Sequence, residues 1–191
     1  MNHRPTRRTV LASAAIVPLT SLSLKAQPAP VFSTAQLAIL EAFADRLAPA
    51  DETGPGAREC GAVNYIANTL SDFAAAEKPQ FLAGLASLDD LARKSHDRGF
   101  ADLAPAEQDE VLAAFENDSR PFFNRVRQLT LEGMFGDPFY GGNREFRGWD
   151  LIRYPGPRLA VSGNEQKLRD PIKPLRSSSY GGKRYGDEHG H

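Results

Sequence analysis

The sequence of 191 residues predicts an all-α protein: one domain of about five helices, followed by an irregular C-terminal tail rich in aromatic residues and glycine. Apolar residues recur at helical spacing in five separate segments, and proline or glycine separates those segments. No alternating strand pattern of any length occurs. The length suits a single domain, and 41% hydrophobic with 25% charged residues is ordinary for a globular protein.

The first helix is expected to begin after Ser33 and to stop before Pro49. The sequence Ser33-Thr34-Ala35-Gln36 has the form of a capping box, in which the serine and glutamine side chains each bond the other residue's backbone amide. Proline cannot continue a helix, because it lacks the amide hydrogen and clashes with the preceding turn. The apolar positions at helical spacing are Leu37, Leu40, Phe43, Ala44 and Leu47.

Four further helices are expected, and their apolar stripes are assigned to the core. The second covers Glu59 to Ala76, with Phe73 included on its apolar face. The third opens at Pro79 and ends near Gly99. The fourth starts at Pro105, where Glu107 places an acid against the positive helix end. The fifth runs from about Arg120 to Phe135.

Residues 1–26 have the pattern of an export signal and are excluded from the fold. Arg7 and Arg8 precede a mildly apolar stretch that begins with Val10 and Leu11. This arrangement resembles a twin-arginine signal peptide, in which the arginine pair is read by the translocase and the protein is moved already folded. A generic secretory signal or an uncleaved anchor is the alternative. The signal predicts a periplasmic protein with the twin-arginine translocase as a partner.

Charge and cysteine content restrict the function further. Without the first 27 residues the chain contains 19 Lys or Arg and 24 Asp or Glu. This excess of acidic residues disfavours a nucleic-acid binder. Cys60 is the single cysteine, so the chain alone can form neither an internal disulfide nor a cysteine-ligated cluster. Two interpretations of Cys60 stay open: a buried small apolar residue, or a disulfide to a partner subunit in an oxidising compartment.

Patterns for catalysis are missing from the sequence. Only His96, of the four histidines, falls in the expected helical body. Neither the glycine-rich dinucleotide fingerprint nor a phosphate-binding loop is present. We therefore assign no catalytic, cofactor-binding or metal-binding residue to this chain.

Residues 136–157 gather aromatic side chains, glycines and charges outside any helical pattern. The segment either packs its own aromatics onto the helices or forms a docking loop for another protein, since aromatic residues and arginine dominate protein interfaces. Residues 161–191 are expected to be extended or disordered. The candidate docking residues are Asp137, Pro138, Tyr140, Gly141, Gly142, Asn143, Trp149, Tyr154 and Pro155.

The same region resembles a known family. The residues that support the resemblance are Glu132 to Asn143 (EGMFGDPFYGGN), Gly148 to Ile152 (GWDLI) and Tyr154-Pro155-Gly156. They are similar to the signature of the gluconate 2-dehydrogenase subunit 3 family, the small or gamma subunits of periplasmic glucose, gluconate and fructose dehydrogenases. The likeness covers about residues 30–160, within an expected small-subunit domain of residues 27–160.

The resemblance implies a non-catalytic accessory subunit. In such complexes a large subunit holds FAD and oxidises the sugar, and a multihaem cytochrome c subunit commonly takes the electrons. The small subunit then acts as the twin-arginine export escort and maturation partner of the flavoprotein, and a partner subunit can hold the complex at the inner-membrane surface. The alternative is a stand-alone periplasmic sugar-binding protein or enzyme that uses the 137–149 loop, with Asp137, Tyr140, Asn143 and Trp149 around the sugar.

Overall fold

The computed structural model describes residues 30–158, 160–163, 165–167 and 172–181. Arg7, Arg8, Val10 and Leu11 of the expected export signal lie outside the described residues. Within the described ranges the secondary structure is helical, with no strand, which confirms the predicted all-α class. The α-helices are α1 (Thr34–Leu47), α2 (Ala57–Cys60), α3 (Ala62–Ser71), α4 (Lys78–His96), α5 (Pro105–Asp118), α6 (Arg120–Phe135) and α7 (Arg147–Leu151).

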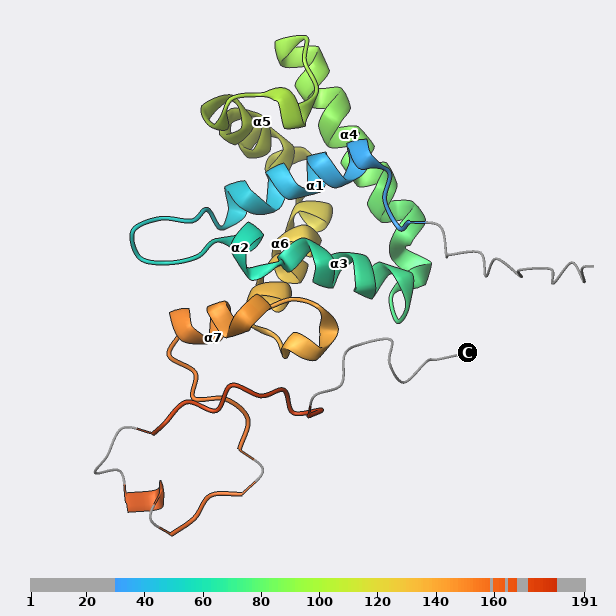
Figure 1. The fold of residues 1–191 in the computed structure, drawn as a ribbon. Helices are drawn as coiled ribbons and strands as arrows, with labels where there is room; N and C mark the ends of the chain where they lie inside the picture. The colour runs from blue at the N-terminus through green and yellow to red at the C-terminus, as the bar shows by residue number, and fades with distance from the viewer. Residues whose placement is uncertain (1–29, 159, 164, 168–171, 182–191) are drawn as a thin grey trace, which may run out of the picture.

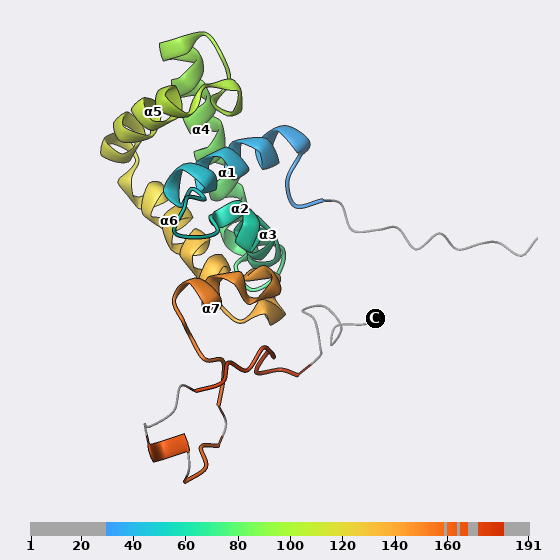
Figure 2. The same ribbon diagram turned by 60° about the vertical axis from the view of Figure 1, so that its left-hand side comes forward.

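Helix α6 runs through the middle of the helical body (Figure 1). It contacts α1, α2, α3 and α5 along its length, and its packing against α3 is the most extensive. Helices α4 and α5 pack together at one end, and α7 lies against α6 at the other end (Figure 2). In the part of the chain that the structure describes, no helix combines the length and apolarity that crossing a membrane requires.

The expected helix starts are confirmed where local chemistry sets them. The Gln36 amide donates to Ser33 Oγ at 3.3 Å, and the Ser33 amide donates to Gln36 Oε1 at 2.9 Å, so the capping box of α1 is complete. At the start of α5 the Ala104 amide donates to Glu107 Oε2 at 2.8 Å. These bonds satisfy amides that the first turn of a helix leaves without partners.

The prediction of a second helix over Glu59 to Ala76 is wrong in two respects: the helix is interrupted, and it ends earlier. Gly61 has a φ of 71°, and this left-handed residue ends α2 and starts α3. The left-handed conformation is open to glycine at little cost, so the chain bends sharply there. Helix α3 ends at Ser71 and not at Ala76, and Phe73 beyond it is 62% exposed.

The core follows the apolar stripes of the other helices. Phe81 of α4 meets Phe122 of α6 edge-on, with ring centres 5.2 Å apart. Burial of each such aliphatic or aromatic side chain stabilises the fold by about 1.5–3 kcal/mol. The largest fully buried apolar side chains are Leu40, Phe43, Ile66, Leu70, Leu85, Leu88, Phe100, Val126 and Leu129.

Candidate functional site

The segment that follows α6 folds back under the end of that helix. It forms two short 3-10 turns, η3 (Pro138–Tyr140) and η4 (Arg144–Phe146), before α7. Gly141 and Asn143 take positive φ values of 94° and 42°. Both conformations agree with the turn-rich composition, because glycine and asparagine tolerate the left-handed region better than other residues.

Asn143 is the central residue of this loop, and its side chain is completely buried. Its Nδ2 donates to the Gly136 carbonyl at 2.9 Å, and its Oδ1 accepts from the Gly148 amide at 2.9 Å and more weakly from the Trp149 amide at 3.4 Å. The Asn143 amide itself donates to the Gly133 carbonyl at 2.6 Å. The Asn143 side chain therefore joins the start of the loop to the start of α7, and its backbone amide joins the loop to the end of α6.

Glycines allow the loop backbone to lie directly on α6. A Cβ atom on Gly142 would overlap the Gly133 carbonyl, and one on Gly148 would overlap the Met134 carbonyl. Gly133 in turn lets α6 approach α3, since a Cβ there would lie 2.8 Å from Ala62 Cα. Gly142 is thus needed for close approach, whereas its neighbour Gly141 is needed for positive φ.

Trp149 faces inward, with only 3% of its surface exposed. Its Nε1 donates to the Phe135 carbonyl at 2.9 Å, and its ring lies against Phe146 and Tyr154 at centroid distances of 5.4 and 5.0 Å. In this structure Trp149 holds α7 against the end of α6. Its predicted contact with a partner stays a prediction, and substitution of Trp149 would disturb the loop before it tested any docking.

A second aromatic cluster joins the loop to the C-terminal segment 172–181. Tyr180 stacks on Phe139 at a centroid distance of 4.2 Å, and the hydroxyls of Tyr140 and Tyr180 share a hydrogen bond of 2.9 Å. That hydrogen bond is the first cause that raises the pKa of Tyr140 to about 12. Tyr65 on α3 meets Tyr140 edge-on and donates to Glu132 Oε2 at 2.9 Å. Part of the expected irregular tail is therefore packed against the loop.

Asp137 links the loop to the C-terminal segment 172–181 through hydrogen bonds from both. Its Oδ1 accepts from the Phe139 amide at 2.9 Å and its Oδ2 accepts from the Ser179 amide at 2.8 Å. Burial raises the pKa of Asp137, but hydrogen bonds from Ser178 and from the amides of Phe139 and Ser179 outweigh burial and lower the pKa below its ordinary value. These bonds favour the ionised carboxylate, which accepts them more strongly than the neutral acid does.

Because the pKa of Asp137 is lowered in the folded state, the stability that it contributes is present above its unfolded pKa of about 4 and is lost as the pH falls through the folded value. We expect the Ser179 amide to be protected from hydrogen exchange at pH 6 and exposed in strong acid, after correction for intrinsic exchange. Asp137→Asn should expose it at both pH values. Asp90→Asn, at an exposed position on α4, is the control. Equal protection in Asp137→Asn and the parent protein would contradict this role.

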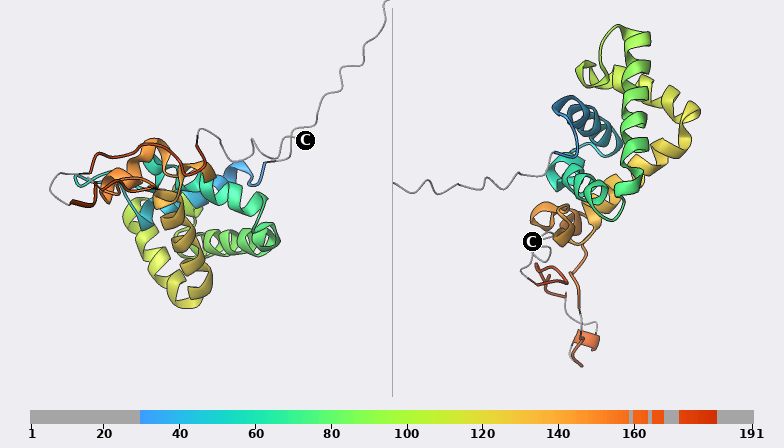
Figure 3. Two further views of the ribbon diagram at one scale, coloured as in Figure 1. Left: turned by 90° about the horizontal axis from the view of Figure 1, so that it is seen from below. Right: turned by 90° about the vertical axis from the view of Figure 1, so that its right-hand side faces the viewer.

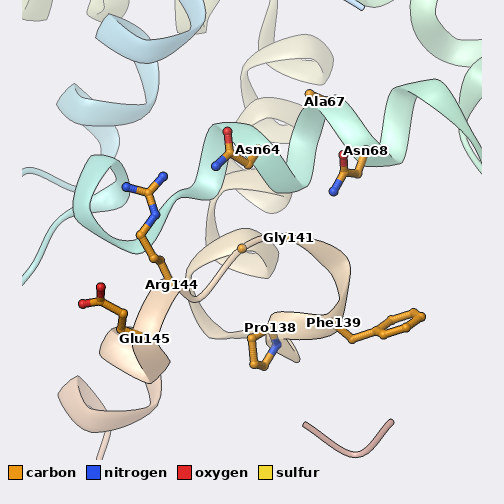
Figure 4. A pocket seen from close by; sticks show the side chains of 9 residues that line it. Asn64, Ala67, Asn68, Pro138, Phe139, Gly141, Arg144 and Glu145 are labelled. Atoms are coloured by element: carbon orange, nitrogen blue, oxygen red, sulfur yellow. The ribbon is translucent and has the colours of Figure 1, made fainter. Parts of the chain in front are cut away.

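A cavity of about 630 Å³ lies between α3 and the loop (Figure 4). Asn64 and Asn68 face it from α3, and Arg144 and Glu145 line it from η4. The Asn68 side chain donates to the Tyr140 carbonyl at 3.0 Å and so joins the two walls. The lining mixes polar with apolar residues and carries both charge signs. Within the described residues no group of three His, Cys, Asp or Glu side chains could hold a metal ion.

The structure separates the predicted docking residues into two groups. Gly142, Asn143 and Trp149 are buried and support the loop from inside. Tyr154 is 39% exposed, and Asp137, Pro138, Tyr140, Gly141 and Pro155 are partly exposed. Sequence reasoning missed Gly133, whose role depends on a contact with Ala62 that no local pattern signals. It also missed Tyr180, which lies 40 residues along the chain from Tyr140.

Cys60 lies in the hydrophobic core, with none of its surface exposed. Burial is the first cause that raises the pKa of its thiol, which keeps the sulfur protonated and unreactive. A disulfide to a partner subunit finds no support in this position. The other interpretation of Cys60, a buried small apolar residue, agrees with the structure.

The fold and the loop define a small helical protein whose signature residues hold one end of the helical body in a fixed shape. The chain belongs to the gluconate 2-dehydrogenase subunit 3 family, whose model matches residues 34–156. It is therefore an accessory subunit of a dehydrogenase of this type, and membership implies a catalytic partner subunit. Comparison with curated proteins and with solved structures yields no match.

Proposed function

We propose that this chain is the non-catalytic small subunit of a periplasmic FAD-dependent sugar or sugar-acid dehydrogenase, and that it serves as export escort and maturation partner of the flavoprotein. The family match over residues 34–156 is the observation that supports this most directly. FAD would reside in the large subunit and haem c in a third, cytochrome subunit. Arg7 and Arg8 would direct the folded complex to the twin-arginine translocase.

The arrangement of the loop agrees with an accessory role. Its most deeply placed polar side chain, Asn143, bonds only backbone groups of its own chain among its described contacts. A sugar site formed by Asp137, Tyr140, Asn143 and Trp149 would need all four side chains at the surface. Asn143 is 0% and Trp149 3% exposed, so these two residues cannot stack on or bond a sugar in this conformation.

The test is affinity purification of the tagged chain from the periplasm of the source cells, with flavin content and sugar-dependent dye reduction as readouts. We expect a second, flavin-containing chain to copurify and the complex to reduce the dye with gluconate, glucose or fructose. The tagged chain purified alone should neither bind these sugars in calorimetry nor reduce the dye. Turnover by the isolated chain would overturn the proposal in favour of a stand-alone enzyme.

A further inference from the structure

Most of the exposed large apolar side chains among the described residues belong to the C-terminal part of the chain. Of the large hydrophobic residues that the described ranges expose, only Phe73 and Leu131 come before α7. The other exposed residues lie at the last position of α7 or after it, although residues 151–181 make up only a small share of the described chain. They are Leu151, Ile152, Tyr154, Val161, Ile172, Leu175 and Tyr180.

Four of these residues belong to two segments that lie together, 152–158 and 172–176, which we call the C-terminal arm. The Leu175 amide donates to the Pro155 carbonyl at 2.7 Å, and Arg158 donates to the Lys173 carbonyl at 2.6 Å. Arg176 pairs with Asp150 at the end of α7. Gly156, with a φ of 91°, lets the segments touch, because a Cβ there would overlap the Leu175 carbonyl. The arm is thus fixed to α7.

The arm extends beyond α7, away from the other helices, in Figures 1 and 2 and in the right-hand view of Figure 3. No helix of the body covers its apolar side chains: Ile152 is 54%, Ile172 41% and Leu175 45% exposed. Exposed apolar residues that gather in this way mark interaction sites in soluble proteins, whereas singly scattered ones are normal. Phe73 and Leu131 are of the scattered kind.

Charge separates the arm from the rest of the molecule. The arm contains Arg153, Arg158, Lys173 and Arg176 and no acidic residue. Residues 30–150 contain eleven Lys or Arg and twenty Asp or Glu. A partner surface that complements the arm is therefore apolar and bordered by carboxylates, since complementary charge directs association and suppresses wrong partners.

We propose that the C-terminal arm is the surface on which the catalytic subunit docks, through an apolar, acid-bordered face of that subunit. This inference rests on the proposed function, which supplies the partner. The exposed side chains of Ile152, Ile172 and Leu175 form the apolar contact, and Arg153 and Lys173 form its basic border. Asn143 and Trp149 act one layer deeper, because they hold α7 and with it the base of the arm in place.

The test compares matched variants of the full-length chain in the same periplasmic purification. Ile152→Asp with Leu175→Asp should reduce the copurified flavin-containing chain about ten-fold or more, because buried apolar contacts at the centre of an interface dominate its affinity. Phe73→Asp with Leu131→Asp adds the same charges at exposed apolar positions of the helical body and should leave the yield unchanged. Thermal unfolding of each purified variant checks that it folds.

Charge reversal provides a second comparison. Arg153→Glu with Lys173→Glu should lower the yield of the copurified flavin-containing chain and make that yield less sensitive to salt. Lys94→Glu with Arg127→Glu, at exposed positions of α4 and α6, should change neither. A photoreactive residue at position 152 should cross-link to the flavin-containing chain, and one at position 73 should not. Cross-linking in the reverse order would overturn the arm assignment.

The outcomes separate the two proposals. If the parent chain copurifies no flavoprotein, the proposed function fails and the arm assignment fails with it. If the parent and the Ile152→Asp, Leu175→Asp variant copurify equal amounts, the proposed function holds and only the arm assignment is wrong. If that variant instead loses flotation with phosphatidylglycerol vesicles while it keeps the flavoprotein, the arm binds a membrane surface and the assignment is likewise overturned.

Discussion

Asn143→Ala is expected to lower the free energy of unfolding by about 3–5 kcal/mol. The substitution leaves the Gly136 carbonyl and the Gly148 amide without the partners that the Asn143 side chain provides. Each buried backbone group without a partner costs about 1–3 kcal/mol. Alanine also tolerates the φ of 42° at this position less well than asparagine does.

The single tryptophan makes this result measurable, since Trp149 is held by the same network. Chemical denaturation followed by Trp149 fluorescence gives the free energy, and the folded-state spectrum reports whether the ring remains buried. Asn143→Gly retains the backbone freedom without the side chain, so it should destabilise about 1 kcal/mol less than alanine. Asn124→Ala, at an exposed position of α6, should change stability by no more than about 0.5 kcal/mol. A native-like spectrum and stability in Asn143→Ala would contradict the central role of Asn143.

The sequence was most informative where neighbouring residues determine the structure. The capping box between Ser33 and Gln36 forms as expected, and Glu107 lies in the first turn of α5 as predicted, where it also accepts from the Ala104 amide. Both features act within one helical turn. Gly61 is different, because a glycine within an apolar helical pattern does not by itself break the helix. Gly61 nevertheless takes a left-handed φ of 71°, and Arg144 Nε of the loop lies 3.5 Å from where a Cβ on Gly61 would be. The apolar pattern of the neighbouring residues did not show this break.

The loop shows the same division between local and distant causes. Its turn-rich composition predicted irregular backbone, and Gly141 and Asn143 do take positive φ. Composition could not show that Gly142 and Gly148 are pressed against α6, because that requires the position of the helix. For the same reason the interface-like residue types did not reveal that Trp149 points inward while Ile152, three residues later, points to solvent. Residue type predicts the chemistry of a contact, and the fold decides whether its partner is in the same chain.

Arg7→Lys with Arg8→Lys is expected to leave most of this chain, and the catalytic subunit with it, in the cytoplasm. Lysine keeps the positive charge but lacks the planar guanidinium, so a receptor that recognises arginine geometry loses its ligand. Fractionation followed by immunoblotting of this chain and by dye-reduction activity in each fraction measures the effect. Arg4→Lys, which changes an arginine outside the pair, should leave export intact.

The double substitution should block export of both proteins only if the signal of this chain serves both. The location of the flavoprotein is therefore the more informative readout. Retention of both in the cytoplasm supports a complex that is assembled before export, since the twin-arginine route moves folded cargo. Continued export of this chain by the double variant would show a general secretory signal, and the escort role would fall. Retention of this chain with normal export of the flavoprotein would mean that the catalytic subunit has its own route. The arm would then have to meet its partner in the periplasm.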